Sequence, residues 1–475
     1  MDQQLQVEGR QAPSPGQGVG PRLLIQVGTE IEGTETERLF FHRFRRAAEL
    51  GLNVHVATAW PSRFWNATLP RLCHHDTPTR HAAIALGATF QLYRLPPESR
   101  SRELEIFSLQ QYTKAMSELK YLDARSDADR VVTTLICCLA FFVIESLRGN
   151  TRVALTHLAG GNSIIGTFPP EKIAFLNNPK MKVTNEGEAI SEFDMEYLLM
   201  QFDSLSMSGG MVVEDFDLTM TNRLYGARKL DPTMPDSLDT LRDVHISVMG
   251  QCRDVFSFAW EIKSHQRGVR PFDVEPWSQP FLYAQYKVLM KRGAKLKRLL
   301  LEFEKRPDFP KHATPEYYSF YTDRLHFACQ DLTSSIMPEL PDIRPTPDTM
   351  QKFQDIMSLI LVVRQGISLA DVQEQNGRLF TLDGGIMQPL YLIACCCPDR
   401  ALRRRALHLL RTWPRQEHLW DFSTVKKLIG SAGSIQASPD SQSFQLFRGV
   451  PTLYERVVEL QRAMADEKAT EPGRK

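Results

Sequence analysis

A run of about 14 residues dominated by apolar side chains, Val131–Ile144, restricts the possible folds more than any other part of this 475-residue sequence. Charged residues bracket the run: Asp129 and Arg130 precede it, and Glu145 and Arg148 follow it. A helix that spans a membrane needs about 20 apolar residues, so this run is too short. Because the run is apolar on nearly every helical face, we expect a helix in the protein core with other helices around it.

The residues before this run have the periodicity of an amphipathic helix. Apolar side chains recur at spacings of three and four residues, which places one stripe on a helix face: Ile106, Leu109, Tyr112, Met116 and Leu119. After the central run, Gly149-Asn150 predicts a helix end. Another helix begins with Val153–Leu158, and Gly160-Gly161-Asn162 predicts its end.

Further helices are predicted along the rest of the chain. They are Glu192–Ser204, Ser237–His265, Pro280–Phe303, Pro315–Ser335, Pro347–Asn376, Gly385–Cys397, Asp399–Thr412 and Leu453–Ala465. Strand signals are scarce: Leu23–Val27 and Val54–Ala59 are short apolar runs, but neither has a partner at hairpin spacing. We therefore predict an all-α fold, a large multi-helix array of antiparallel helices.

Proline-rich stretches divide the predicted helical region into blocks. The stretches are Phe168-Pro169-Pro170, Pro271–Pro280 and Pro338–Pro347, and proline at this density excludes helix interiors. The predicted region covers residues 23–465, with blocks at roughly 23–168, 190–335 and 348–465.

Both ends of the sequence are polar. Residues 1–22 are rich in Gln, Gly and Pro and contain no apolar segment of the kind found in a secretory signal. These residues and residues 466–475 cannot bury enough apolar surface to offset the entropy lost on ordering, so we expect two disordered tails.

Charge and cysteine usage narrow the class of protein. Lys plus Arg is 57 and Asp plus Glu is 56, so the net charge of +1 favours neither nucleic acid nor an anionic membrane as a partner. The eight cysteines include Cys137-Cys138 and Cys395-Cys396-Cys397, which lie in apolar runs. This placement indicates buried free thiols in a reducing compartment rather than a disulfide framework.

Several short clusters resemble ligand sites, but each has a simpler structural interpretation. Successive side chains on a helix diverge by about 100°, so Cys395-Cys396-Cys397 cannot converge on one metal ion and are interpreted as core residues. His74-His75-Asp76 precedes Pro78 and is interpreted as a helix cap or a polar turn. His81 follows in an apolar helix, where we expect a partly buried histidine.

The sequence contains no recognisable arrangement for catalysis. The glycine pairs in Gly160-Gly161-Asn162 and Asp383-Gly384-Gly385 do not follow a strand within a phosphate-binding pattern, so both are interpreted as helix ends or turns. GxSxG, Walker and HExxH motifs are absent from the sequence. We therefore predict that the protein is not an enzyme and assign no catalytic, cofactor-binding or metal-binding residue.

Three basic clusters lie on predicted helices, at Arg43–Arg46, Lys291–Lys297 and Arg403–Arg405. A solvated charged face is the ordinary explanation for such a cluster. A nuclear import signal or a set of phosphate contacts is the alternative.

Four segments, in order along the chain, resemble one known family. Phe64–Gly87 has an aromatic pair, a Leu-rich turn and an Arg-His-Ala sequence. Leu109–Met116 reads LQQYTKAM, and Phe141–Leu158 joins two helices through Leu-Arg-Gly-Asn. Pro389–Asp421 has an Arg-rich helix and a Trp-Pro pair that leads to Trp-Asp. Over residues 23–465 the chain resembles the fungal-specific transcription factor domain, the helical region that follows a binuclear zinc cluster.

Two residues depart from the family's pattern without affecting the expected fold. His418 stands where relatives usually have Gly, and Thr79 stands where many have an apolar residue.

The resemblance implies the regulatory region of a non-catalytic transcriptional regulator in the nucleus, with the cytoplasm as the alternative location. Implied partners are other transcription factors or co-regulators, including full-length zinc-cluster relatives, and a small-molecule effector. No cofactor and no membrane partner are expected. The resemblance to this family also suggests a role in secondary metabolism. Two alternatives stay open: a helical scaffold or ligand-binding protein without a transcriptional role, and a truncated gene product of a full zinc-cluster factor.

The largest departure from the family concerns the zinc cluster. Its two zinc ions need six cysteines in two halves that contain CxxC pairs. The sequence has no CxxC pair, and its first cysteine, Cys73, is already inside the predicted helical region. We therefore expect no direct DNA binding by a zinc cluster, and regulation through protein partners or a small effector.

Overall fold

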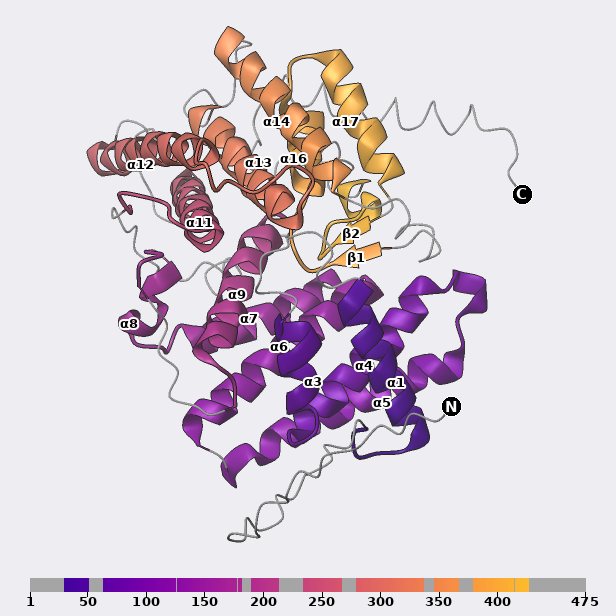
Figure 1. Cartoon of the computed structure of the whole chain (residues 1–475). Helices are drawn as coiled ribbons and strands as arrows, with labels where there is room; N and C mark the ends of the chain where they lie inside the picture. The colour runs from indigo at the N-terminus through magenta and orange to yellow at the C-terminus, as the bar shows by residue number, and fades with distance from the viewer. Residues whose placement is uncertain are drawn as a thin grey trace, which may run out of the picture.

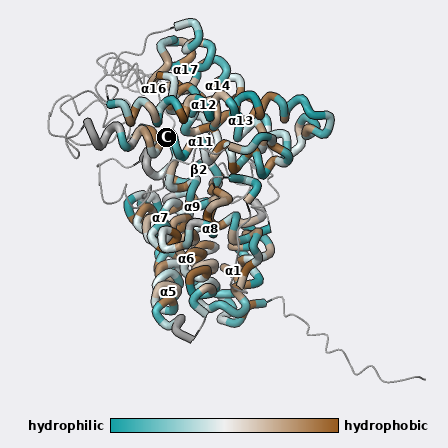
Figure 2. The backbone as a smooth tube through the Cα atoms, turned by 90° about the vertical axis from the view of Figure 1, so that its left-hand side faces the viewer, coloured by the Kyte–Doolittle hydropathy of each residue, from teal (hydrophilic) through white to brown (hydrophobic). Residues whose placement is uncertain are grey.

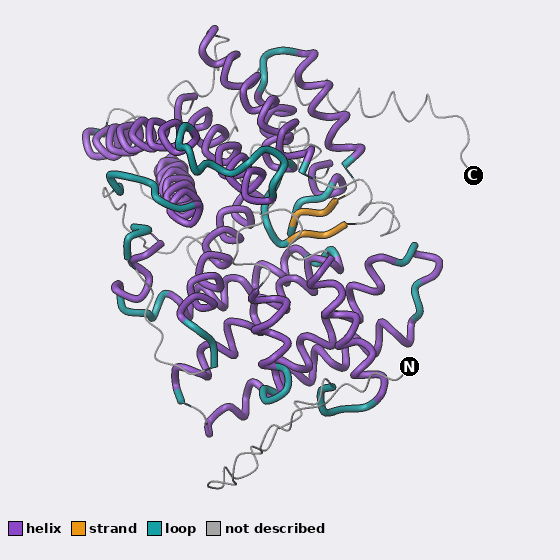
Figure 3. Tube along the Cα trace, viewed as in Figure 1, coloured by secondary structure: helices purple, strands orange, loops and turns teal. Residues whose placement is uncertain are grey.

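The computed structural model describes residues 30–50, 63–124, 126–176, 178–181, 189–212, 234–266, 279–336, 346–366, 379–413 and 415–426. These residues are predominantly helical, with one pair of very short strands (Figure 3). The predicted all-α fold is confirmed. Five predicted segments lie outside the described residues: the tails 1–22 and 466–475, the apolar runs 23–27 and 54–59, and the helix 453–465.

The first half of the chain forms the lower layer of helices in Figure 1. Its helices are α1 (Glu35–Leu50), α3 (Leu69–Leu72), α4 (Thr77–Arg94), α5 (Arg102–Glu118), α6 (Asp127–Arg148), α7 (Thr151–Ile165), α8 (Pro170–Ile173) and α9 (Glu192–Val212). Helix α4 contacts α1, α5 and α6, and α6 in turn contacts α7 and α9.

The second half forms the upper layer (Figure 1). Its helices are α11 (Leu241–Gln266), α12 (Pro280–Glu304), α13 (Pro315–Ile336), α14 (Pro347–Gln365), α16 (Met387–Cys396) and α17 (Arg400–Thr412). Most helices begin and end within a few residues of their predicted bounds. Helix α9, however, continues to Val212, beyond the predicted end at Ser204, and α14 ends at Gln365 rather than Asn376.

The upper layer also contains two short strands, which were not predicted from the sequence. Strand β1 (Leu379–Thr381) pairs in parallel with β2 (Arg415–Glu417), with Phe380 opposite Gln416. Three residues in each strand are too few for the alternating pattern by which a strand is recognised in a sequence.

Helix α6 is the core helix predicted from the apolar run Val131–Ile144. All residues from Leu139 to Leu147 are buried, and hydrophobic residues gather around this helix in Figure 2. By length and composition the helix could cross a membrane, yet 78% of its most apolar window is buried inside the protein. The helix ends as predicted: Gly149 takes φ of 77°, and its N–H donates to the Glu145 carbonyl.

Helix α5 does not place its apolar stripe in the core. The side chains of Ile106, Leu109 and Met116 are 46%, 37% and 39% exposed, although such a stripe ordinarily faces inward. The buried residues of this helix are Ser108, Gln111, Tyr112 and Ala115. Of the residues in the predicted apolar stripe, only Tyr112 is among these buried residues of α5.

Hydrogen bonds between polar side chains explain the orientation of α5. The hydroxyls of Ser108 and Thr89 lie 2.7 Å apart. Gln111 Nε2 donates to Glu37 Oε1 over 2.8 Å, and Gln111 Oε1 lies 2.6 Å from His81 Nδ1. Because these bonds satisfy the buried polar groups, a polar face can pack against α1 and α4.

The prediction that Gly160-Gly161-Asn162 ends a helix is wrong, because α7 continues to Ile165. A methyl group on Gly161 would lie 2.1 Å from a ring carbon of Phe202, which is fully buried in α9. Gly161 therefore allows α7 and α9 to approach closely, and this contact offsets the low helix propensity of glycine. A methyl group on Gly160 would have no neighbour within 4 Å.

Buried ion pairs join α9, α11 and α12. Arg253 of α11 donates to Asp203 of α9 over 3.0 Å and lies 3.4 Å from the carboxylate of Asp254. The other oxygen of Asp254 accepts from Arg292 of α12 over 2.5 Å. All four side chains are at most 6% exposed. Buried charges persist only when they are paired and hydrogen-bonded, so these pairs fix how the three helices are placed.

The adjacent glycines of α7 give a matched pair for a stability test. Gly160→Ala should raise the free energy of unfolding by about 0.5–1 kcal/mol, because alanine loses less backbone entropy in a helix. Gly161→Ala should lower it by about 1–3 kcal/mol, because the methyl group collides with Phe202. Urea denaturation followed by circular dichroism measures both, and equal effects at the two positions would contradict the close packing of α7 on α9.

Asp254 and Glu302 provide a second matched pair. Asp254→Ala should lower the free energy of unfolding by about 3–5 kcal/mol, because Arg292 is left buried without its partner. Glu302→Ala removes an exposed ion pair in which Glu302 Oε1 lies 3.6 Å from Arg298 Nε. This variant should change the free energy of unfolding by less than about 0.5 kcal/mol. Denaturation of the two variants under the same conditions is the measurement, and a small loss for Asp254→Ala would show that the buried pairs do not hold the helices.

Candidate ligand-binding pocket

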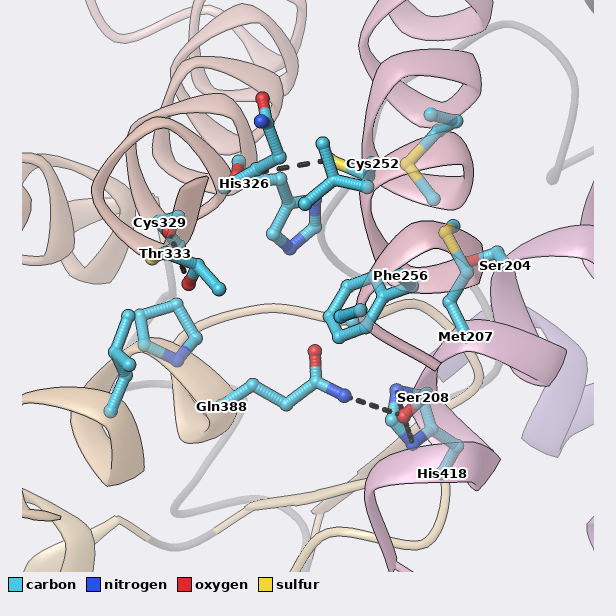
Figure 4. A pocket seen from close by; sticks show the side chains of 17 residues that line it. Ser204, Met207, Ser208, Cys252, Phe256, His326, Cys329, Thr333, Gln388 and His418 are labelled. Atoms are coloured by element: carbon cyan, nitrogen blue, oxygen red, sulfur yellow. Dashed lines mark hydrogen bonds between the residues drawn. The ribbon is translucent and has the colours of Figure 1, made fainter. Parts of the chain in front are cut away.

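A pocket lies where the two layers meet, between α9, α11, α13 and α16 (Figure 4). The pocket has a volume of about 880 Å³, part of which is open to solvent. Pockets that hold small organic molecules are concave and mostly apolar, with a few polar groups that orient the ligand. This pocket has room for a compact ligand of that kind.

Helix α11 supplies more of the apolar lining residues of the pocket than any other helix. Met249, Cys252, Phe256 and Ala259 recur at spacings of three and four residues, so they share one face of the helix. Burial raises the pKa of the Cys252 thiol, which keeps it uncharged. The pocket also has apolar lining from α9 and α16, namely Met207, Pro389 and Leu392.

Ser208 of α9 is the centre of one polar end of the pocket. Gln388 Nε2 donates to Ser208 Oγ over 2.7 Å, and Trp420 Nε1 donates to it over 3.0 Å. Both ring nitrogens of His418 lie 3.2 Å from the same oxygen. Three segments that are far apart in the sequence thus meet at one hydroxyl group, as Figure 4 shows for Gln388, Ser208 and His418.

The backbone of His418 has a conformation that favours glycine, with φ of 42°. Two hydrogen bonds hold it there: His418 N–H donates to the Thr381 carbonyl over 2.7 Å, and Gln416 Nε2 donates to the His418 carbonyl over 2.8 Å. The position at which the resembling family usually has Gly therefore has a left-handed backbone. Because this chain has His418 there, an imidazole ring lies in the wall of the pocket.

Ser208 and His418 do not have the properties of a nucleophile and its base. Burial, together with a smaller effect of the nearby His326, lowers the pKa of His418 to about 3. The Leu419 N–H donates to His418 Nδ1 over 2.9 Å, where a catalytic triad would have an acidic acceptor for an Nδ1 proton. A general base needs a pKa near the working pH, so this pair is better suited to holding the pocket together than to catalysis.

Helix α13 provides the opposite polar side of the pocket through His326 and Gln330, which lie one helical turn apart. Burial lowers the pKa of His326. Gln330 Nε2 donates to Ser334 Oγ over 2.7 Å. Within the described residues, His326 Nδ1 and Gln330 Oε1 are buried atoms that have no hydrogen-bond partner.

Two carboxylates lie next to this side of the pocket. Asp323 Oδ1 is 2.8 Å from Nδ1 of His245, and burial raises the pKa of Asp383 to about 6. Gln201 Nε2 donates to Asp383 Oδ1 over 3.3 Å. No such pair of acidic residues stands out in the sequence, because Asp323 and Asp383 are 60 residues apart.

None of the pocket residues was predicted as a site. The lining comes from positions between 204 and 418, and no local motif marks them. One signal was available in the sequence: His418, at a position where the resembling family has Gly.

The cysteine clusters are core residues, as predicted. Cys395, Cys396 and Cys397 are buried free thiols, and burial raises the pKa of Cys395 to about 12. Cys137 is buried and Cys138 partly buried. In the part of the chain that the structure describes, no group of three or more His, Cys, Asp or Glu side chains is arranged to hold a metal ion.

His74-His75-Asp76 is a turn with a helix cap, as predicted. Asp76 Oδ1 accepts from the Thr79 N–H at the start of α4 over 3.0 Å. Its other oxygen accepts from the hydroxyl of Thr133 over 2.6 Å, which ties this turn to α6. A capping carboxylate of this kind satisfies a free backbone N–H group.

Asp383-Gly384-Gly385 is the turn that leads into α16, also as predicted. The carboxylate of Glu417, which is 2% exposed, accepts hydrogen bonds from the N–H groups of Gly385, Ile386 and Met387 at 2.9–3.0 Å. A negative charge at a helix N-terminus is favourable, so β2 fixes the position of α16 and its pocket residues.

Arg43, Arg45 and Arg46 are exposed, as predicted, but the other two basic clusters are only partly solvated. Arg292 is buried in its pair with Asp254. Arg403 is 6% exposed and donates to the carbonyls of Cys397 and Pro398 at 2.9 and 2.8 Å. The interpretation as solvated faces is therefore wrong for Arg292 and Arg403, whose charges stabilise the fold from inside.

Comparisons with known proteins identify the family of this chain. Residues 52–432 match the family described as the fungal specific transcription factor domain. The aspercryptin biosynthesis cluster-specific transcription regulator atnN of Emericella nidulans is 35% identical over 124 residues, which are 25% of this chain and 20% of that protein. No solved structure matches the chain. Because the family match covers most of the chain, the protein belongs to the family of the fungal specific transcription factor domain.

Proposed function

We propose that this chain is the non-catalytic control region of a fungal transcriptional regulator, and that a small effector in the pocket sets its output. The pocket between the two layers carries this proposal. One wall belongs to α9 of the lower layer and the other walls belong to α11, α13 and α16 of the upper layer. A ligand that contacts both layers favours the arrangement to which it binds best, and this is how an effector changes the activity of a regulator.

Protein partners are the proposed route from this region to the genes. The 475 residues contain no CxxC pair and have a net charge of +1, so neither a zinc cluster nor a general attraction to DNA is evident in them. We propose that other transcription factors or co-regulators, including full-length zinc-cluster relatives, are the partners. The proposed location is the nucleus.

A biosynthetic gene cluster is the proposed target. This step rests on the name of the Emericella nidulans relative, which regulates the aspercryptin cluster, and that relative is matched over a fifth of its length. Transcript profiles of a deletion strain would identify the target genes directly.

Filling the pocket should abolish regulation. In a deletion strain, wild-type protein and Cys329→Ala, which keeps the pocket open, should restore the transcripts that the deletion changes. Cys329→Leu places a bulkier side chain in the pocket lining and should restore less than about a tenth of the response. RNA sequencing of the three strains is the measurement, with protein levels and melting temperatures checked for each variant.

Two results would contradict the proposal. Full restoration by Cys329→Leu would show that the pocket has no part in regulation. A deletion strain with unchanged transcripts under conditions in which the protein is present would show that the chain does not regulate transcription.

The nuclear location is tested by a fluorescent tag on the chain. The tagged protein should be found in the nucleus in at least one growth condition in which the target genes respond. Live-cell microscopy across inducing and non-inducing media measures this, with untagged cells as the background control. Exclusion from the nucleus in every condition would support a cytoplasmic scaffold instead.

A further inference from the structure

We infer that a groove between α12 and α14 is the docking site for a helix of a partner protein, a helix with an apolar stripe and one acidic flank. This inference rests on the proposed function, because it names the chemistry of a proposed protein partner. Three features of the molecule support it: the shape of the groove, the spacing of the residues along α12 and the charge of that helix.

The groove lies over α13, with α12 and α14 as its walls. Helix α13 contacts both neighbours, and the space between them has a volume of about 920 Å³, part of which is open to solvent. Its apolar floor comes from Leu300, Phe327, Ala328 and Leu359. Among the described residues, none lines both this groove and the pocket. An open groove with an apolar floor is the kind of surface that binds the apolar face of an amphipathic helix.

The α12 wall has the residue spacing of a helix that packs against another helix. Lys297, which lines the groove, belongs to a stripe whose members recur at alternating intervals of four and three residues. The stripe consists of Tyr283, Lys287, Met290, Ala294, Lys297 and Leu301. Such intervals are typical of paired helices, in which the side chains of one helix fit between those of the other.

This stripe is open to a partner along most of its length. Tyr283 and Leu301 are 46% and 40% exposed, and the smaller Ala294 is exposed as well. The Nζ atom of Lys287 lies 4.4 Å from the centre of the Tyr283 ring, a cation–π contact that orders both side chains. Figure 1 shows α12 at the outer edge of the upper layer, where another helix can approach it. Exposed apolar side chains in a row of this kind indicate an interaction surface.

The charge of α12 indicates that the partner is acidic. Before its last turn, the helix has six basic residues and no acidic residue, in a chain with a net charge of only +1. Arg292 and Lys295 have carboxylate partners in Asp254 and Asp236. The other exposed cations have one nearby carboxylate among the described residues, the Glu302 group beside Arg298. A single exposed ion pair contributes little, but several that form together select an acidic partner and steer it to this surface.

The opposite side of the groove fixes how such a partner is oriented. Its cations already have partners: Lys352 Nζ lies 3.2 Å from Asp331 Oδ2, and Arg324 donates to Glu304 over 2.7 Å. Asp355 on the α14 wall has no cation as a partner among the described residues, so it repels other carboxylates. The acidic flank of the partner therefore lies toward α12, and its apolar stripe covers the floor of the groove.

The exposed apolar side chains favour a protein partner over a nucleic acid. The phosphates of a DNA duplex would contact the lysines of α12 but would leave Tyr283, Leu301 and the apolar floor of the groove uncovered. A protein helix with both apolar and acidic residues can contact all of these groups at once.

The inference is tested with the full chain and three labelled peptides, by fluorescence anisotropy. The acidic peptide is a helix of about three heptads with Leu at positions a and d, Glu at g and Gln at e. One control peptide has Lys in place of every Glu, and the other has Ala in place of every Leu. The acidic peptide should bind at least about 10-fold more tightly than either control, and a rise in NaCl from about 50 to about 500 mM should weaken its binding.

Variants connect the binding to the groove. Lys287→Glu with Lys297→Glu reverses two charges of the stripe, so it should weaken binding of the acidic peptide at least about 10-fold and strengthen binding of the Lys peptide. The control, Lys120→Glu with Arg404→Glu, makes the same change in net charge at other exposed positions and should leave both affinities within about 2-fold. Asp355→Lys removes the repulsion from the α14 wall and should tighten binding of the acidic peptide. Melting temperatures establish that each variant is folded.

Four results in this assay would overturn the inference. They are no binding of the acidic peptide, equal binding of the acidic and Lys peptides, unchanged affinity in the Lys287→Glu, Lys297→Glu variant, and unchanged or weaker binding in Asp355→Lys. Tighter binding of a DNA duplex of random sequence than of the acidic peptide would also overturn it, because α12 would then be a nucleic-acid surface.

The same variants separate this inference from the proposed function. In the deletion strain, the Lys287→Glu, Lys297→Glu variant should restore less than about half of the transcript response, and the Lys120→Glu, Arg404→Glu control should restore all of it. Full restoration by the first variant would show that no partner of the regulator docks in the groove. The proposed function fails separately, if deletion leaves the transcripts unchanged or if Cys329→Leu restores them in full.

Discussion

The ion pair between Arg253 and Asp203 holds α11 against α9, and the pocket depends on that contact. Ser204 and Cys252, which line the pocket, are the chain neighbours of this pair. Asp254 extends the same set of charges to Arg292 of α12. Because separating buried charges leaves them unpaired, α9 and α11 are held together more firmly than apolar contacts alone would hold them. In the proposed function, a ligand would act mainly on the other walls of the pocket, which come from α13 and α16.

Helix α9 connects the two layers because both of its sides are used. One side packs in the lower layer, where Phe202 lies against Gly161 and the hydroxyl of Tyr197 accepts from Trp65 Nε1 over 2.7 Å. The other side presents Met207 and Ser208 to the pocket. A helix that is buried all round has no solvent-facing stripe. Because α9 also contacts α6 and α7, it links the pocket to the core of the lower layer.

The sequence predicted those features that depend on one local pattern. The core position of α6 followed from a run that is apolar on every face, and its end at Gly149 followed from a single glycine. The prediction failed where long-range contacts decide. The inward face of α5 is set by polar partners such as Glu37, and Gly161 is explained only by Phe202 on another helix. The pocket was not predicted for the same reason: it exists only after α9, α11, α13 and α16 have packed.

His418 shows how a backbone constraint becomes a feature of the pocket. A left-handed residue other than glycine is strained by about 1 kcal/mol, and such residues gather at functional sites. Here the bond to the Thr381 carbonyl and the adjacent strands β1 and β2 hold the residue in place. With glycine at this position the backbone would be relaxed, but Ser208 would lose a neighbour and the pocket would lose one wall. The imidazole therefore narrows the pocket, and the β1–β2 pairing holds its strained backbone in place.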